Sequence, residues 1–91
     1  MIPRIRARRR QRLLLALLAE PSGVGFVQLA HLAQIGGLAV ASHLDRLEAD
    51  GWVARHRTHS VNGPVRVYRL TADGLAGARR ELGLTDGQVS G

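Results

Sequence analysis

Arginine is the residue type with the clearest chemistry in this 91-residue chain, and it is concentrated in two stretches that contain no acid. Six of the thirteen basic residues fall within the first twelve positions, and all thirteen are arginine. The second stretch is 51–70, which contains Arg55, Arg57, Arg66 and Arg69. Guanidinium groups form paired hydrogen bonds with phosphate oxygens. With a net charge of +6, these clusters predict a phosphate-rich partner.

Residues that could carry catalysis or bind metals are sparse. His56 and His59 have a ligand-like spacing, but no third ligand accompanies them and the chain has no cysteine. The segment at 23–25 lacks the third glycine of a dinucleotide loop, and no serine lies in a nucleophile elbow. No apolar run approaches the ~20 residues of a membrane span. The sequence therefore predicts no enzyme activity, no metal, no cofactor and no membrane partner.

The central element is an amphipathic helix predicted for residues 38–50. Val40, Leu44 and Leu47 recur at i, i+4 and i+7, so one apolar stripe must be buried. The opposite face is small or polar with one long cation: Ala39, Ser42 and Arg46. Such a face fits a DNA groove, where the N-terminal half of a recognition helix enters. Gly51 then supplies a residue that ends the helix easily.

Another helix precedes this one and a β-hairpin follows it. A helix at 26–33 and a tight connector at 34–37 complete a helix-turn-helix unit. Extended runs at 52–58 and 65–70 flank an Asn-Gly dipeptide at 62–63, which is typical of hairpin turns. The predicted class is α+β, mostly α. The fold is a winged helix-turn-helix with a three-helix core, a two-stranded β-wing and a short C-terminal helix.

From residue 12 to residue 82 the chain resembles the MarR/PadR/ArsR-like winged-helix DNA-binding domains, especially the short stand-alone bacterial regulators. The resemblance lies in RLLLALLAE, ASHLDRLEADGWV and VYRLTADG. The second of these is similar to the family's Ser-x-His-Leu-x-x-Leu-Glu-x-x-Gly recognition helix. Ala41 stands where the family often has Ser, and Gly36 and Gly37 stand where a Ser or Thr usually caps that helix. The resemblance implies double-stranded DNA binding and transcription regulation.

The apolar run at 13–19 supplies the first helix. Leu14, Leu17 and Leu18 could form its core stripe, which leaves Leu15 either as an ordinary exposed leucine or as part of a subunit interface. Basic residues before the run and Glu-Pro-Ser-Gly after it superficially resemble a secretory signal. The run is at the lower limit of length for a signal, and the domain needs it as a helix, so we interpret it as part of the fold.

A last helix is predicted for 72–82, with Thr71 as its N-terminal cap. Leu75, Ala78 and Leu82 could pack on the first helix or on a partner's copy. Two glycines within this helix weaken it, each by up to ~1 kcal/mol relative to alanine. A domain of this size has a marginal core, so dimerisation is a plausible stabiliser. We therefore expect a homodimer formed through the first and last helices.

The chain divides into a basic N-terminal arm at 1–12, the winged-helix domain at 13–82 and a flexible tail at 83–91. The arm either contacts phosphates and the minor groove, as such arms do in some DNA-binding domains, or is a solvated basic leader.

We predict a small dimeric transcriptional regulator, cytoplasmic and nucleoid-associated, that binds specific double-stranded DNA. Helix 38–50 would contact the major groove, and the wing and arm the backbone or minor groove. The predicted DNA-binding residues are Ala39, Ser42, His43, Arg46, Arg55, Arg57, His59, Asn62, Arg66, Arg4, Arg6, Arg8 and Arg9. Two alternatives are a winged helix used as a protein-interaction module and a phage-type architectural or recombination accessory factor.

Overall fold

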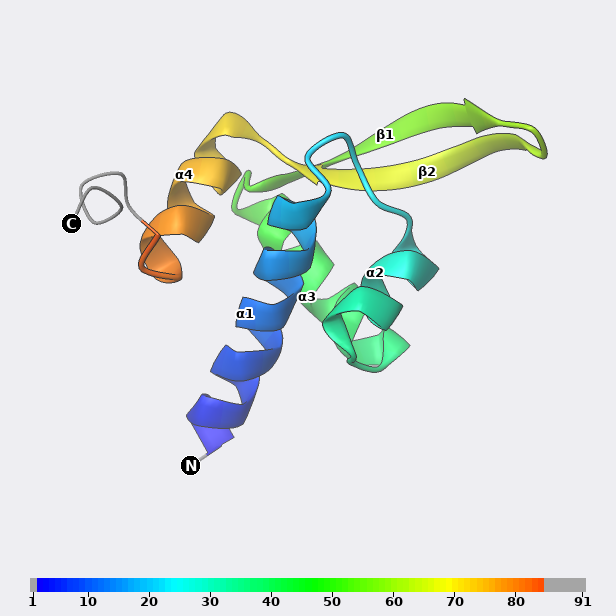
Figure 1. The fold of residues 1–91 in the computed structure, drawn as a ribbon. Helices are drawn as coiled ribbons and strands as arrows, with labels where there is room; N and C mark the ends of the chain where they lie inside the picture. Colours follow the sequence, from blue (N-terminus) through cyan, green and yellow to red (C-terminus); the bar gives the residue numbers. More distant parts are fainter. Residues whose placement is uncertain (1, 85–91) are drawn as a thin grey trace.

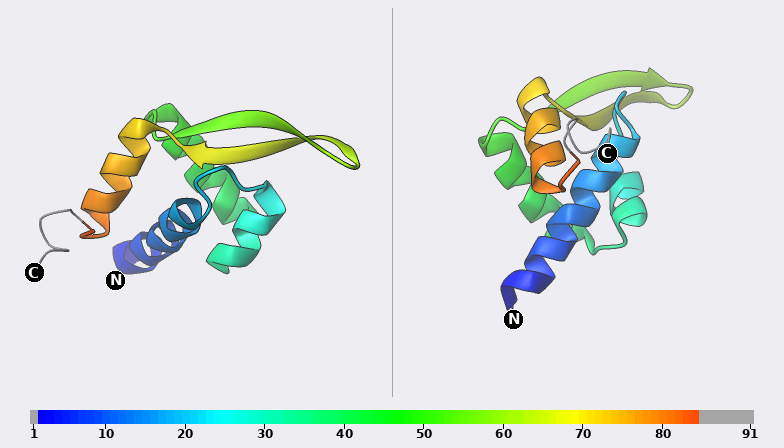
Figure 2. Two further views of the ribbon diagram at one scale, coloured as in Figure 1. Left: turned by 45° about the horizontal axis from the view of Figure 1, so that its top comes forward. Right: turned by 60° about the vertical axis from the view of Figure 1, so that its left-hand side comes forward.

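The computed structural model describes residues 2–84 of the chain. These residues form four helices and one two-stranded antiparallel sheet (Figure 1). In chain order they are α1 (Ile2–Ala19), α2 (Phe26–Ala33), α3 (Gly37–Ala49), β1 (Val53–Ser60), β2 (Gly63–Leu70) and α4 (Ala72–Glu81). The hairpin of β1 and β2 projects beyond the helices (Figures 1 and 2). The predicted fold class is confirmed. Most of the predicted tail, 85–91, lies outside the described residues.

The first helix is longer than its apolar run predicts, because the basic segment before that run is helical from the second residue onwards. Leu13, Leu14 and Leu17 are fully buried, whereas Leu15 is 50% exposed. Helices α2 and α4 and strand β2 all contact α1, so more than one side of it is covered. This explains why the adjacent Leu13 and Leu14 are both buried, although only Leu14 was expected in the core stripe.

Helices α2 and α3 are joined by the short turn that the sequence predicts. Their buried residues are Leu29 and Ala33 in α2 and Val40, Leu44 and Leu47 in α3. Gln34, at the end of α2, has the left-handed φ of 57°, which turns the chain toward α3. Gly51 follows α3 with a φ of 78°, as expected for a residue that ends a helix. The predicted buried stripe of α3 is confirmed.

The hairpin ladder is more complete than predicted. It continues as far as Ser60 opposite Gly63, so the expected loop at 59–64 is reduced to a two-residue turn. Gly63 has a φ of 111°, which glycine adopts without strain. At the base of the hairpin, Val24 forms an isolated bridge with Tyr68, in which the nitrogen-to-oxygen distances of the two backbone hydrogen bonds are 2.9 Å and 2.8 Å. The bridge ties the α1–α2 loop to β2 and fixes the direction of the wing.

Helix α4 packs directly on Trp52 through its two glycines. A Cβ atom on Gly74 would overlap the backbone of Trp52, and one on Gly77 would overlap its indole ring. Both glycines are buried, together with Ala78. Thr71 caps the helix as predicted, because its hydroxyl accepts the N–H of Gly74 at 3.0 Å. The glycines that lower the propensity of this helix are therefore what allows its close approach to Trp52.

Candidate nucleic-acid interface

The face of α3 opposite its buried stripe is open to solvent. Ser42 and Arg46 are both exposed on it, as predicted, while Ala39 and His43 are half-buried at its edges. Leu38, which was not among the predicted DNA contacts, is 91% exposed in the first turn of the same helix. Helical spacing places Leu38 and Ser42 one turn apart on one face. A helical-wheel projection centred on the buried stripe could therefore have identified Leu38.

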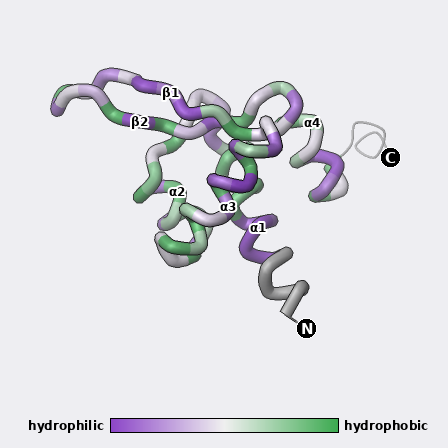
Figure 3. The backbone as a smooth tube through the Cα atoms, turned by 180° about the vertical axis from the view of Figure 1, so that it is seen from behind, coloured by the Kyte–Doolittle hydropathy of each residue, from purple (hydrophilic) through white to green (hydrophobic). Residues whose placement is uncertain are grey.

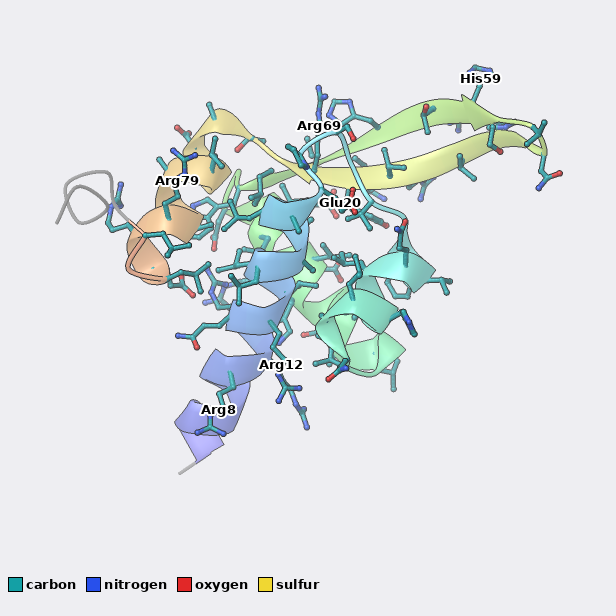
Figure 4. The ribbon with its side chains drawn as sticks, viewed as in Figure 1. Arg8, Arg12, Glu20, His59, Arg69 and Arg79 are labelled. Carbon is teal, nitrogen blue, oxygen red and sulfur yellow. The ribbon has the colours of Figure 1, made fainter. Side chains whose placement is uncertain are left out.

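Three arginines of α1 lie beside the start of α3. They are Arg8, Arg9 and Arg12, and they line a hollow of about 480 Å³ together with Gln34, Ile35, Gly36 and Ala39. Arg8 and Arg12 project from α1 into solvent (Figure 4). Gly36 caps α3 without a side-chain hydrogen bond, so the helix terminus offers only backbone N–H groups there. The tertiary structure thus joins part of the basic segment to the helix-turn-helix unit.

Arg10 is directed elsewhere and has a structural role. Its Nε atom is 2.7 Å from Oε2 of Glu81, and its Nη2 donates to Oε1 of the same carboxylate at 3.2 Å. Its guanidinium carbon also lies 5.2 Å from the centre of the Trp52 ring, a cation–π distance. These contacts link α1, α4 and the start of the wing. The backbones of Arg4 and Arg6 lie in α1, but their side chains are outside the described part of the structure.

Two wing arginines lie side by side on one face of the hairpin. Arg57 pairs with Arg66 across the ladder, and both side chains are exposed. They line a hollow of about 480 Å³ with Phe26, Pro64, Val65 and Tyr68. Within residues 8–84, neither arginine has an ion-pair partner. Seen from behind, β1 is largely hydrophilic, whereas β2 alternates between hydrophilic and hydrophobic residues (Figure 3). Like charges at this spacing suit a shared anionic partner rather than a packed protein interior.

The other two wing arginines are already engaged. Nε of Arg55 is 2.8 Å from Oε2 of Glu48 on α3, and 52% of the Arg55 side chain and 24% of the Glu48 side chain are exposed. Nε of Arg69 donates to Nε2 of His56 at 2.9 Å on the opposite face of the sheet. The stretch 51–70 contains no acid, but folding brings an acid of α3 to Arg55. Arg55 can therefore bind a phosphate only in competition with Glu48.

Comparison with solved structures places these features in a known fold. A MarR-family transcriptional regulator from Silicibacter pomeroyi superposes with a TM-score of 0.68 and 26% identity, over 85% of this chain and 50% of that one. The transcriptional repressor CouR, bound to a 23-mer DNA duplex, superposes with a TM-score of 0.65 and 29% identity, over 81% of this chain and 51% of CouR. A PadR-family transcriptional regulator from Eggerthella lenta superposes with a TM-score of 0.63 and 26% identity, over 80% of this chain and 70% of that one.

The chain is a winged helix-turn-helix domain. It spans about half the length of the MarR-family regulator and of CouR. No protein-family model matches its sequence, and no curated protein is significantly similar to it. The three solved structures named above are described as transcriptional regulators, and the structure of CouR contains a DNA duplex.

The tip of the wing in this winged-helix domain is held by local hydrogen bonds. The backbone N–H of Asn62 donates to Oγ of Ser60 at 3.2 Å, and that hydroxyl donates to the carbonyl of Gly63 at 3.1 Å. His59 and Asn62, both predicted DNA contacts, are exposed there, and Figure 4 shows His59 near the end of the hairpin. The tip is therefore a small projection held by local hydrogen bonds, and it exposes the apolar side chain of Val61 beside the polar side chains of His59 and Asn62.

Neither metal-binding clusters nor membrane spans occur in the described part of the winged-helix domain. Within residues 2–84, no three His, Cys, Asp or Glu side chains gather where they could hold a metal ion. His56 contacts Arg69 instead of joining a ligand set with His59. No helix in the same range combines the length and the apolar character needed to cross a membrane.

Proposed function

We propose that this winged-helix domain binds specific double-stranded DNA as a transcriptional regulator. The observation that carries the proposal is the position of Arg8, Arg9 and Arg12 beside the N-terminus of α3. In helix-turn-helix docking the N-terminal part of the recognition helix enters the major groove, and the groove is bordered by phosphates. Cations at that end of α3 are where a DNA backbone would pass. The 23-mer duplex in the CouR structure supports the same partner.

Sequence recognition is proposed to come from the exposed face of α3. Arg46 can form two hydrogen bonds with a guanine, and the hydroxyl of Ser42 can bond to any base edge. Ala39 and His43 border this face and complete the proposed base-contacting surface. Phosphate contacts from α1 would position the helix but carry no base information. The proposed arrangement therefore separates positioning residues on α1 from base-reading residues on α3.

The wing is proposed to contact the backbone or minor groove with Arg57 and Arg66, helped by His59 and Asn62 at the tip. Exposure of all four side chains supports this role. Arg55 would join them only after leaving Glu48. A protein acting in this way would work in the cytoplasm on the nucleoid.

Salt dependence tests DNA binding, and two matched arginine pairs test the geometry. Arg8→Ala/Arg9→Ala removes two exposed charges of α1, whereas Arg79→Ala/Arg80→Ala removes two exposed charges of α4. Each phosphate contact contributes about −0.9 to the slope of log affinity against log salt, so the α1 pair should make this negative slope shallower by about 1.8. The α4 pair should leave the slope near its wild-type value.

The outcomes separate the proposal from its alternatives. If the unmodified protein shows no affinity for duplex DNA at ~50 mM salt, where non-specific binding is strong, DNA binding is refuted and a protein-interaction module is favoured. Equal slopes for the two variants would show that the α1 arginines do not meet DNA. Strong bending of DNA without sequence preference would favour an architectural factor.

We also infer a homodimer formed through α1 and α4. Leu15 of α1 is 50% exposed and Leu75 of α4 is 38% exposed, and both are available for a second copy. Sedimentation equilibrium should give twice the chain mass of 9.8 kDa, and Leu15→Glu/Leu75→Glu should give the monomer mass. A monomer at all concentrations of the unmodified protein would exclude this dimer.

A further inference from the structure

Leu38 is the most exposed leucine among residues 8–84, with 91% of its surface accessible. It occupies the second position of α3 and therefore the first helical turn. Successive helical residues are rotated by about 100°, which places Leu38 and Ser42 almost directly opposite the buried stripe. An isolated exposed leucine is ordinary on a protein surface. What distinguishes this one is its position at the centre of the face that we propose to enter the major groove.

The surroundings of Leu38 leave it as the dominant side chain of that turn. Gly36 and Gly37 precede it and Ala39 follows it, and none of these carries a side-chain donor or acceptor. Apart from its neighbours in the chain, no residue has an atom within 4 Å of where a Cβ on Gly36 would stand, so open space adjoins this turn. The hollow lined by Arg8, Arg9, Arg12 and Gly36 borders the same end of α3. An apolar side chain therefore projects beside a proposed phosphate position.

We propose that Leu38 contacts the C5-methyl group of a thymine, so that the binding site requires a T·A pair at one fixed position. The thymine methyl is the apolar feature of the major groove, and every other base-edge group there that proteins read is a hydrogen-bond donor or acceptor. The side chain of leucine has no hydrogen-bond donor or acceptor, so this methyl group is the base feature that it can recognise. The inference rests on the proposed function, because it assumes that α3 lies in the major groove.

Substituting uracil for thymine tests the contact, because deoxyuridine differs from thymidine only by the missing methyl group. A duplex selected from a random pool is prepared in versions that each carry one deoxyuridine. At one thymine position, which lies beside the N-terminus of α3 in the complex, uracil should weaken binding of the unmodified protein about fourfold relative to the thymine duplex. This is the effect expected when the burial of one methyl-sized group is lost. Leu38→Ala should bind the thymine and uracil versions of that site equally, because the interaction is already lost.

Val27→Ala provides the matched control. Val27 is an aliphatic residue of α2 with 80% exposure, so its loss should leave the response to uracil unchanged. The inference is overturned if the unmodified protein is insensitive to uracil at every position, or if Leu38→Ala remains sensitive. It is also overturned if Leu38→Ala changes the oligomeric state or lowers the melting temperature, because Leu38 would then serve a protein interface.

Failure of this inference can be distinguished from failure of the proposed function. A protein that prefers its selected duplex over a scrambled one, but does not respond to uracil, retains the proposed function and lacks the Leu38 contact. A protein that binds no duplex at ~50 mM salt refutes both.

Discussion

Glu48 and Arg55 form an ion pair between α3 and the wing, and Glu48→Gln would release the arginine without changing the size of the side chain. Because both partners are partly exposed, 52% for Arg55 and 24% for Glu48, the pair should contribute only about 0.2 to 1 kcal/mol to stability. DNA affinity should change in the opposite direction, since Arg55 becomes available for a phosphate. One added contact makes the negative slope of log affinity against log salt steeper by about 0.9.

The assay is DNA affinity measured between ~50 and ~200 mM salt, together with chemical denaturation. Across this fourfold range, one extra contact makes the loss of affinity about 3.5 times greater for Glu48→Gln than for the unmodified protein. Asp73→Asn, which removes one negative charge from the first turn of α4, is the control and should leave the slope unchanged. An unchanged slope for Glu48→Gln would refute the idea that Glu48 competes with DNA for Arg55.

Three further predictions concern packing and base contact. Gly77→Ala should destabilise the fold by about 1 to 3 kcal/mol in denaturant unfolding, because its Cβ would overlap the Trp52 ring; an unchanged midpoint would mean that α4 packs more loosely. Arg46→Ala should melt like the unmodified protein but lose about 1 to 3 kcal/mol of binding at a selected site and much less at a scrambled one. Leu44→Ala should instead cost about 2 to 5 kcal/mol of stability; similar melting of these two variants would show that Arg46 is structural.

The elements of the fold could be predicted because each is specified by nearby residues. Helical spacing alone identified the buried stripe of α3, and the Asn-Gly dipeptide located the hairpin. The turn itself is formed by Val61 and Asn62, one position earlier than Asn-Gly, because Gly63 pairs with Ser60. The length of the first helix could not be obtained in this way. A run of arginines has no apolar period, so composition could not show that the basic segment continues α1.

Part of the candidate interface could also be predicted. Exposure of Ser42 and Arg46 follows from their position opposite the buried stripe, and the structure agrees. The arginines were harder to separate, because all of them look alike in sequence. Arg10 is held by Glu81, 71 positions away, and by the ring of Trp52. Arg8 lies beside the start of α3 instead.

The sequence by itself therefore determined the order and type of the elements, the buried face of α3 and the presence of a basic surface. These properties depend on periodicity, turn chemistry and charge, which act over a few residues. Only the tertiary structure decided which cations are available to a ligand, that Glu48 neutralises Arg55, and that the glycines of α4 accommodate Trp52. The physical reason is that ion pairs and close packing depend on which elements meet in space, and residues distant in sequence determine those meetings.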